Sequence, residues 1–399
     1  MTWIDIPANS QFGAESLPLG IFRVGDEEPR MGAAIGDQVI DLAPVASAQM
    51  LDGAHFAEPT LNAFLALGRP AWHATREWLL DLVRNENNRD AVEPHLIPQS
   101  QVTMQLPFEV ADYVDFYASE HHASNVGKLF RPDAEPLLPN WKHLPVGYHG
   151  RAGTVVASGT DIIRPSGQRK APADSDPTYG PSLRLDIEVE LGYVVGVPST
   201  LGSRVAVDDF KDHVYGVVLL NDWSARDIQA WEYVPLGPFL GKSFATSISP
   251  WVVSLEALEP AEVALGKQEP AVLPYLANDR LTNLDITFEV YWNGELVSSP
   301  PYREMYWSAA QMLAHLSVNG ASVRTGDLFA SGTVSGAEKN QRGSFLELSW
   351  GGREPITVKG EERTFLADGD EVTITATAAT PGGTTIGLGS VTGRILPAI

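Results

Sequence analysis

Three carboxylates occupy alternate positions in residues 182–192, SLRLDIEVELG. Asp186, Glu188 and Glu190 alternate with apolar residues, a pattern typical of a β-strand because successive side chains point to opposite faces. The carboxylates would then share one face about 7 Å apart, where each adjacent pair repels by about 2 kcal/mol at an effective dielectric near 20. Such a row requires either a solvated strand face or a bound cation.

A divalent cation would turn these repelling carboxylates into ligands. The sequence contains no cysteine, which excludes disulfides, thiolate nucleophiles and thiolate zinc sites. A metal would therefore be held by oxygen or imidazole, and Ca²⁺ or Mg²⁺ suits an oxygen donor set. Asp115 and Asp222, each next to an aromatic residue, are the candidate partners for Glu188 and Glu190. A half-exposed strand with a solvated polar face is the alternative.

A histidine pair, His121 and His122, lies in the polar stretch 112–131. Imidazole, with a free pKa of about 6.5, is the side chain best suited to remove a proton from water at neutral pH. A surface histidine pair without a catalytic role is the alternative. The nearby serines do not form a G-x-S-x-G motif, which disfavours a serine hydrolase.

Residues 221–251 combine hydrogen-bond donors with aromatic side chains. Arg226, Gln229 and Lys242 lie among tryptophan, tyrosine and phenylalanine residues, including Tyr233. This combination is suited to binding a small organic acid and stabilising a developing negative charge. A charged helix leading into a Pro-Gly loop is the alternative.

The first hundred residues must form a small domain beside these segments. The Gly36-Asp37 pair between two apolar runs predicts a tight hairpin and a small β-barrel or meander. Apolar residues at i, i+3 and i+4 predict two helices, around residues 61–65 and 79–83, with Pro70 near the start of the second. The proline-containing segment 93–110 is interpreted as a connector between domains.

Beyond residue 115, short apolar runs alternate with Gly, Pro, Asn and Asp, which predicts an all-β sandwich or roll. One helix interrupts it, with Ser308 as its N-cap and Gly320 past its end. The predicted fold class is thus mainly β, of the α+β type.

The charge balance excludes two classes of partner. The 28 basic and 50 acidic residues give a net charge of −22, which repels nucleic acid and anionic membranes. The longest central apolar run, VYGVVLL, is far shorter than the ~20 residues that cross a bilayer. The start of the chain lacks the features of a signal peptide, so a cytoplasmic location is expected.

Several long motifs together resemble the fumarylacetoacetase family: HLPVGYHGRA, NDWSARDIQ, WEYVPLGPFLGKSF, GDLFASGTVSG and LELSW, with LPLGIF and RMGAAIGDQVIDL near the start. The likeness covers nearly the whole chain. It implies a homodimer with a small SH3-like N-terminal domain over residues 1–114 and a larger C-terminal mixed β-sandwich roll over residues 115–399. It also implies metal-dependent hydrolysis of the C–C bond of 4-fumarylacetoacetate to fumarate and acetoacetate, the last step of tyrosine and phenylalanine catabolism.

The resemblance also implies roles for individual residues. Asp115, Glu188, Glu190 and Asp222 would bind Ca²⁺, with Asp186 at the edge of the site and not a ligand. A second cation, Mg²⁺, would lie near Asp222, Lys242 and Thr246. His122 would be the general base oriented by Glu347, and Arg226, Gln229 and Lys242 would stabilise the oxyanion. The positions that match substrate contacts are Tyr117, Arg131, Tyr148, Gln229, Tyr233 and Thr333.

Two alternatives stay open at this point. The chain could hydrolyse another β-diketo acid on the same fold, as acylpyruvate hydrolases do. It could also be a non-catalytic protein that keeps only a Ca²⁺-stabilised scaffold. The joint presence of His122, Glu347 and Lys242 disfavours the second.

Overall fold

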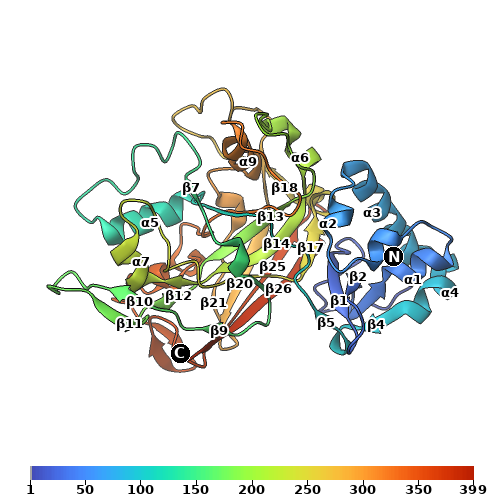
Figure 1. Cartoon of the computed structure of the whole chain (residues 1–399), viewed down its shortest axis with the longest axis horizontal. Coiled ribbons are helices and arrows are strands. Elements are labelled where there is room, and N and C mark those ends of the chain that lie inside the picture. Colours follow the sequence, from blue (N-terminus) through green and yellow to red (C-terminus); the bar gives the residue numbers. More distant parts are fainter. Residues whose placement is uncertain (1) are drawn as a thin grey trace.

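One continuous sheet joins both halves of the molecule in the computed structural model, which describes residues 2–399 (Figure 1). The thirteen-stranded sheet has a main path of ten strands in the order β4, β3, β2, β1, β17, β14, β13, β22, β6, β7. Their bounds in that order are Leu96–Pro98, Gln38–Asp41, Arg30–Ile35, Leu19–Arg23, Trp251–Ser254, Val214–Asp222, Val189–Val195, Leu328–Ala330, Tyr113–Phe116 and Gly147–His149. Off this path lie β5 (Thr103–Met104), β8 (Val155–Ala157) and β16 (Thr246–Ile248).

The N-terminal region places helices against the end of the sheet formed by β1–β4, on the right in Figure 1. The hairpin prediction is confirmed: β2 and β3 pair with Ile35 opposite Gln38, and Gly36 takes φ +60° in the turn. The helices are α1 (Leu42–Ala48), α2 (Asn62–Leu65), α3 (Arg69–Arg84) and α4 (Arg89–Val92). Pro70 lies in the first turn of α3, as expected.

The expected small barrel is an open sheet in the described part of the chain. β1 pairs with β17 as well as with β2, so the N-terminal strands continue into the larger region instead of closing on themselves. β6 spans the predicted boundary between residues 114 and 115, and that domain division stays a prediction.

The connector interpretation of residues 93–110 is wrong. Within this segment β4 pairs with β3 and β5 pairs with β1, so it belongs to the N-terminal sheet. The prolines are compatible with strand pairing here. Pro98 is the last residue of β4, and Pro94 lies before β4 in the short 3-10 helix Glu93–His95, so neither interrupts the hydrogen bonds between the strands.

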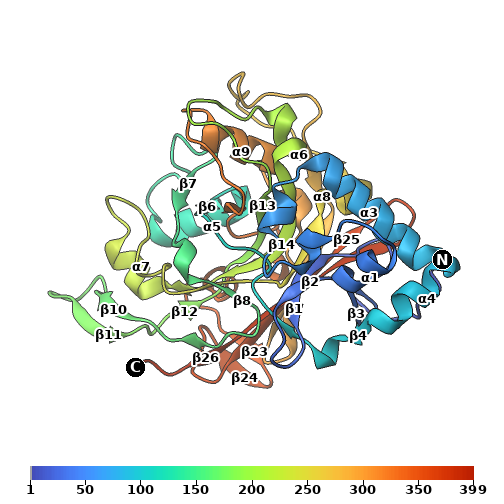
Figure 2. The same ribbon diagram turned by 45° about the vertical axis from the view of Figure 1, so that its right-hand side comes forward.

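A second sheet packs against the first in the C-terminal region, which gives the expected sandwich (Figure 2). Its order is β21 (Glu295–Ser298), β20 (Ile286–Trp292), β25 (Glu371–Ala379), β26 (Thr385–Leu396) and β9 (Ile162–Ile163). β14 contacts β26, and Leu191 and Leu219 of the first sheet share one buried cluster with Phe288, Ile374 and Val391 of the second.

The remaining elements are short and lie around this sandwich. The helix predicted after Ser308 is confirmed as α9 (Ala309–Ser317), where Ser308 and Gln311 form a capping box and Gly320 takes φ +90°. The other helices are α5 (Glu120–Phe130), α6 (Phe210–His213), α7 (Arg226–Glu232), α8 (Leu255–Leu258) and α10 (Phe345–Leu348). Four two-stranded pairs complete the fold: β10 (Ser166–Arg169) with β11 (Thr178–Pro181), β12 (Leu185–Asp186) with β15 (Ser224–Ala225), β18 (Glu262–Ala264) with β19 (Thr282–Leu284), and β23 (Ile356–Val358) with β24 (Glu361–Arg363). Over residues 2–399 no helix has the length and apolar character required to cross a bilayer.

Candidate active site

The acidic segment is not the single continuous strand that its alternation predicts. β12 ends at Asp186 and β13 begins at Val189, so Ile187 and Glu188 lie in a break between the two strands. All three carboxylates are buried, which contradicts the alternative of a solvated strand face. Glu188 and Glu190 belong to a four-carboxylate cluster, whereas Asp186 lies outside it and pairs with Arg226, which also binds Glu188.

Four carboxylates from three separate parts of the chain meet at one point, as the sequence predicts. Asp115 lies in β6, Glu190 in β13 and Asp222 at the end of β14, and Glu188 immediately precedes β13. Each offers an oxygen, and these oxygens lie within 4.8 Å of one another. Sheet order explains the meeting, since β14 and β13 pair directly and β22 connects β13 to β6.

The chemistry of this cluster suits a hard divalent cation. Asp115 Oδ1 and Glu190 Oε1 are buried and have no hydrogen-bond partner within residues 2–399. Burial raises the pKa of both carboxyls well above the usual range, and the nearby carboxylates raise it further. Buried, unpaired carboxylate oxygens are costly, and coordination of a cation would satisfy them.

Lys242 supplies part of the countercharge. Its Nζ donates to Glu188 Oε2 at 2.5 Å and to Asp222 Oδ2 at 2.9 Å. Burial lowers its pKa, but the charges of Asp222 and Glu188 outweigh burial and raise the pKa above the usual value. A protonated amine has no lone pair for a metal, so the side-chain ligands of the predicted second cation site reduce to Asp222 and Thr246.

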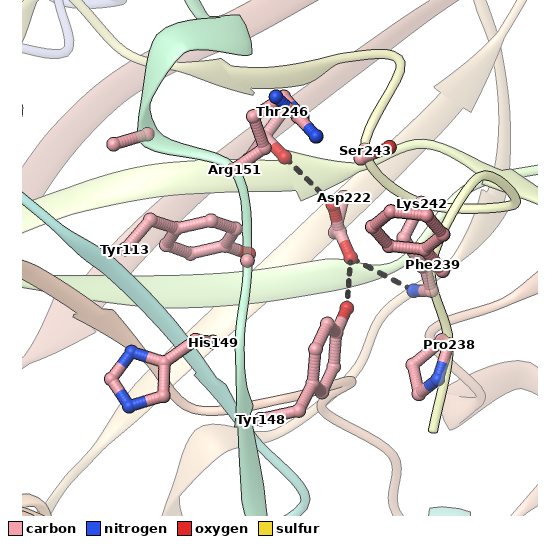
Figure 3. A pocket seen from close by; sticks show the side chains of 12 residues that line it. Tyr113, Tyr148, His149, Arg151, Asp222, Pro238, Phe239, Lys242, Ser243 and Thr246 are labelled. Atoms are coloured by element: carbon pink, nitrogen blue, oxygen red, sulfur yellow. Dashed lines mark hydrogen bonds and ion pairs between the residues drawn. The ribbon is translucent and has the colours of Figure 1, made fainter. Parts of the chain in front are cut away.

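Asp222 is the centre of the second predicted group (Figure 3). Thr246 Oγ1 donates to its Oδ1 at 2.8 Å, and Tyr148 OH donates to its Oδ2 at 3.4 Å. Burial raises the pKa of Asp222, and the Lys242 ammonium opposes that rise. Glu188 differs, because the opposing charges of Lys242 and Arg226 outweigh burial and hold its pKa below the usual range.

His122 and Glu347 form the buried dyad that the resemblance implies. His122 Nδ1 lies 2.7 Å from Glu347 Oε2. The Glu347 pKa is below its usual value because the interactions with His122 and its hydrogen bonds outweigh the effect of burial. An ionised Glu347 accepts a hydrogen bond from Nδ1–H, and in the neutral imidazole this arrangement leaves the Nε2 lone pair free. His121 lies outside the dyad, half exposed and 3.2 Å from Glu304 Oε2.

Arg226, at the start of α7, faces the same centre. Its Nη1 donates to Glu188 Oε1 at 2.6 Å and to Gln229 Oε1 at 3.3 Å. Of the three predicted oxyanion donors, Arg226 and Lys242 therefore both contact Glu188, and Gln229 contacts Arg226.

A cavity of about 380 Å³ brings the dyad, the donors and part of the acidic cluster together. Two of its buried polar atoms, Thr333 Oγ1 and Arg131 Nε, find no partner in the described chain and can bind a ligand. Of the residues predicted for the site, the cavity is lined by Asp115, Tyr117, His122, Arg131, Tyr148, Glu188, Arg226, Gln229, Tyr233, Lys242 and Thr333.

Four predicted residues, Glu190, Asp222, Thr246 and Glu347, do not line this cavity. Asp222 and Thr246 instead line a neighbouring cavity of about 340 Å³, seen in Figure 3. The two cavities share Tyr148, Pro238 and Lys242, so the acidic cluster lies in the wall between them.

The sequence interpretation missed three residues that hold Glu347. Asn125 Nδ2 donates to its Oε1, and Ser335 Oγ and Ser344 Oγ donate to its Oε2, each at 2.9 Å. Two of them had a signal in the sequence. Asn125 follows His122 by three residues and so lies on the same helix face, and Ser344 with Glu347 matches the S-x-x-E spacing of a helix start.

Comparisons with known proteins agree over the full length of the chain. The family model Fumarylacetoacetase N-terminal matches residues 15–107, and Fumarylacetoacetate (FAA) hydrolase C-terminal matches residues 112–396. The fumarylacetoacetase of Caenorhabditis elegans is 47% identical over 417 residues, which cover 100% of this chain and 99% of that protein. The Homo sapiens fumarylacetoacetase is 47% identical over 420 residues, with the same coverage of 100% and 99%.

A solved structure supports the fold. The fumarylacetoacetate hydrolase from psychrophilic Exiguobacterium antarcticum superposes with a TM-score of 0.58 at 18% identity, covering 95% of this chain and 99% of that chain. At this identity the likeness concerns the fold alone.

Proposed function

Because the chain belongs to the fumarylacetoacetase family, we infer that it hydrolyses the C–C bond of 4-fumarylacetoacetate to fumarate and acetoacetate. The observation that carries this function is the single cavity lined by His122, Arg226 and Lys242 beside the acidic cluster. Hydrolysis of a β-diketone requires a base and oxyanion donors around the substrate and a cation site next to them.

We propose the following order of events for these residues. His122 Nε2 takes a proton from water, and Glu347 stabilises the imidazolium that forms. The water oxygen attacks the ketone carbon of the fumaryl group, and Arg226, Gln229 and Lys242 hold the negative oxygen. When the C–C bond breaks, its electron pair leaves with the acetoacetate part, which takes up a proton. A bound divalent cation would act as a Lewis acid on the β-dicarbonyl oxygens.

We propose Ca²⁺ for the four-carboxylate cluster of Asp115, Glu188, Glu190 and Asp222. A set of carboxylate oxygens without sulfur or imidazole favours this ion. Mg²⁺ near Asp222 and Thr246 is the second proposed cation, with Lys242 as a neighbouring countercharge.

The substrate contacts are proposed for the residues whose polar atoms face the cavity. Arg131 and Thr333 have unpartnered buried atoms among residues 2–399 and suit the carboxylate and carbonyl oxygens of a small dianionic acid. Tyr117, Tyr148, Gln229 and Tyr233 complete the lining from other sides.

We also propose a cytoplasmic homodimer. An exposed apolar patch beside the cavity supports the dimer, with Val234, Leu236, Phe239 and Leu240 exposed by 66%, 94%, 59% and 50%. Apolar patches of this kind on otherwise charged proteins are typical of interfaces. Sedimentation of a stable monomer at micromolar concentration would contradict the dimer.

The function is tested by the loss of β-diketone absorbance when fumarylacetoacetate is added to the purified protein. We expect hydrolysis that chelator abolishes and Ca²⁺ restores, because a bound cation supplies the Lewis acid and the positive partner of Asp115 and Glu190. Acylpyruvates are tested in parallel. Faster hydrolysis of an acylpyruvate than of fumarylacetoacetate would favour the alternative substrate class, and no hydrolysis of either would contradict the function.

A further inference from the structure

Asp186 is a fully buried carboxylate that lies next to the acidic cluster without belonging to it. Its Oδ1 accepts the backbone N–H groups of Ile187 at 2.8 Å and Phe345 at 2.7 Å. Its Oδ2 accepts Arg226 Nε at 2.8 Å and the N–H of Leu346 at 3.0 Å. Asp186 does not line the substrate cavity, so any effect on the reaction passes through these neighbours.

The first of these neighbours is the guanidinium of Arg226. Asp186 binds Arg226 through Nε, which leaves Nη1 directed at Glu188 and Gln229 beside the cavity. A guanidinium is planar, so fixing its Nε also fixes the direction of its other N–H groups. Asp186 therefore sets the orientation of a predicted oxyanion donor.

The second neighbour is the turn that carries Glu347. Phe345 and Leu346 are the first two residues of α10, and N–H groups at the start of a helix have no acceptor within the helix. Asp186 accepts both of them. Glu347 is the next residue, and it holds His122 Nδ1 at 2.7 Å.

We propose that Asp186 is a positioning residue that holds the oxyanion donor Arg226 and the His122–Glu347 dyad in one fixed arrangement. The inference rests on the proposed function and adds to it a residue that touches neither substrate nor cation. In the proposed reaction Arg226, in α7, and His122, in α5, act on the same carbonyl group from different helices. Asp186 is hydrogen-bonded both to Arg226 and to the first turn of α10, which carries Glu347.

Asp186→Asn tests this arrangement with little change of shape. The four groups around Asp186 are all hydrogen-bond donors to its two oxygens. The asparagine amide has one oxygen that can accept and an NH₂ group that cannot, so the NH₂ group would face donors. We expect kcat to fall about 100-fold with KM changed less than about threefold, because misplaced catalytic groups cost turnover. An unchanged kcat in folded protein would overturn the proposal.

Double variants distinguish a positioning role of Asp186 from a nonspecific loss of structure. In Glu347→Gln or in Arg226→Lys, one of the two groups is already impaired, so adding Asp186→Asn should cost only about 10-fold. A loss of about 100-fold in every background would mean that the residues act independently, and this would contradict the proposal.

Asp370→Asn is the matched control for removing a buried carboxylate. Asp370 accepts the Ala367 N–H at 2.7 Å and Asn293 Nδ2 at 2.8 Å, and it neither lines the cavity nor contacts Arg226 or Glu347 in the described chain. We expect this variant to lose stability and keep kcat within about twofold. If kcat of Asp370→Asn fell as much as kcat of Asp186→Asn, both losses would reflect a nonspecific disturbance of the fold, and the proposal would be overturned.

Amide hydrogen exchange tests the proposal even if Asp186→Asn does not fold. Arg226 makes no hydrogen bond to Phe345 or Leu346 in the described chain, so Asp186 is the connection between them. In Arg226→Gln we expect exchange at both amides to rise at least about threefold, with the α9 amides unchanged as the sign of an intact fold. Unchanged exchange at Phe345 and Leu346 would overturn the proposal. Hydrogen exchange is measured without substrate, so it tests the positioning role of Asp186 even if the proposed function is wrong.

Discussion

At the scale of single residues, the candidate site is a balance of buried charges. Two cations, Lys242 and Arg226, lie among the carboxylates Asp186, Glu188 and Asp222. They leave Asp115 and Glu190 without a positive partner in the part of the chain that is described. This imbalance is the physical argument for a cation at the cluster.

Lys242→Ala should lower kcat by about 100-fold and change KM by less than about threefold. The reason is that a lost oxyanion donor weakens binding of the transition state more than binding of the substrate. Steady-state kinetics with fumarylacetoacetate measure the separate effects on kcat and KM. Lys211→Ala is the control, because Lys211 also bridges two carboxylates, Glu259 and Glu262, but lies outside this cavity. A Lys242→Ala enzyme with near-normal kcat would rule out the assigned role.

At the scale of elements, two short helices begin in the same way but do different work. Ser308 caps α9 and Ser344 caps α10, each accepting the backbone N–H three residues later. Only Ser344 also donates to the carboxylate of Glu347, at 2.9 Å. The cap of α10 is thus part of the support of the dyad, whereas the cap of α9 supports the fold alone.

Ser344→Ala and Ser308→Ala separate these two effects. Each should lower the free energy of unfolding by about 1 kcal/mol, since each removes an N-cap. Only Ser344→Ala should also lower kcat, by about 10-fold, because Glu347 loses one of the donors that hold it. Urea unfolding and steady-state kinetics on both variants make the comparison, and equal kcat values for the two would argue against the role of Ser344.

At the scale of the whole molecule, the carboxylate cluster links stability to pH and to calcium. Burial raises the pKa of Asp115, Glu190 and Asp222 in the folded chain, whereas unfolded carboxyls titrate near pH 4. Above about pH 4 the unfolded chain releases protons that the fold retains, so the contribution of these groups to stability falls as pH rises. Glu188 and Glu347 contribute in the opposite sense, because their lowered pKa values give stability that is lost on acidification.

Calcium should therefore raise Tm more at pH 8 than at pH 5. The ion replaces protons on the carboxyls with raised pKa, and it competes with them less effectively at low pH. The rise in Tm that calcium causes is measured by thermal unfolding with chelator and with saturating Ca²⁺ at each pH in this range. Asp115→Asn should reduce this rise. A calcium increment independent of pH would contradict the proton-linked site.

Some features of this protein were determined by local sequence. The Gly36-Asp37 hairpin and the Ser308-capped helix follow from residues within a few positions of each other, and both appear as predicted. The absence of cysteine and the row of carboxylates pointed to an oxygen-ligated cation, and long unbroken motifs identified the family.

Tertiary structure alone decided which residues meet. Asp115 joins Glu190 through β22, more than 130 residues further along the chain than β13, and no local pattern encodes that register. The same holds for Asp186: the alternation of residues 185–191 predicted its face, but only the fold brings it to Arg226 and to the first N–H groups of α10. Residues 93–110 resemble a linker because a short edge strand carries little pattern of its own and forms only where a partner strand offers hydrogen bonds.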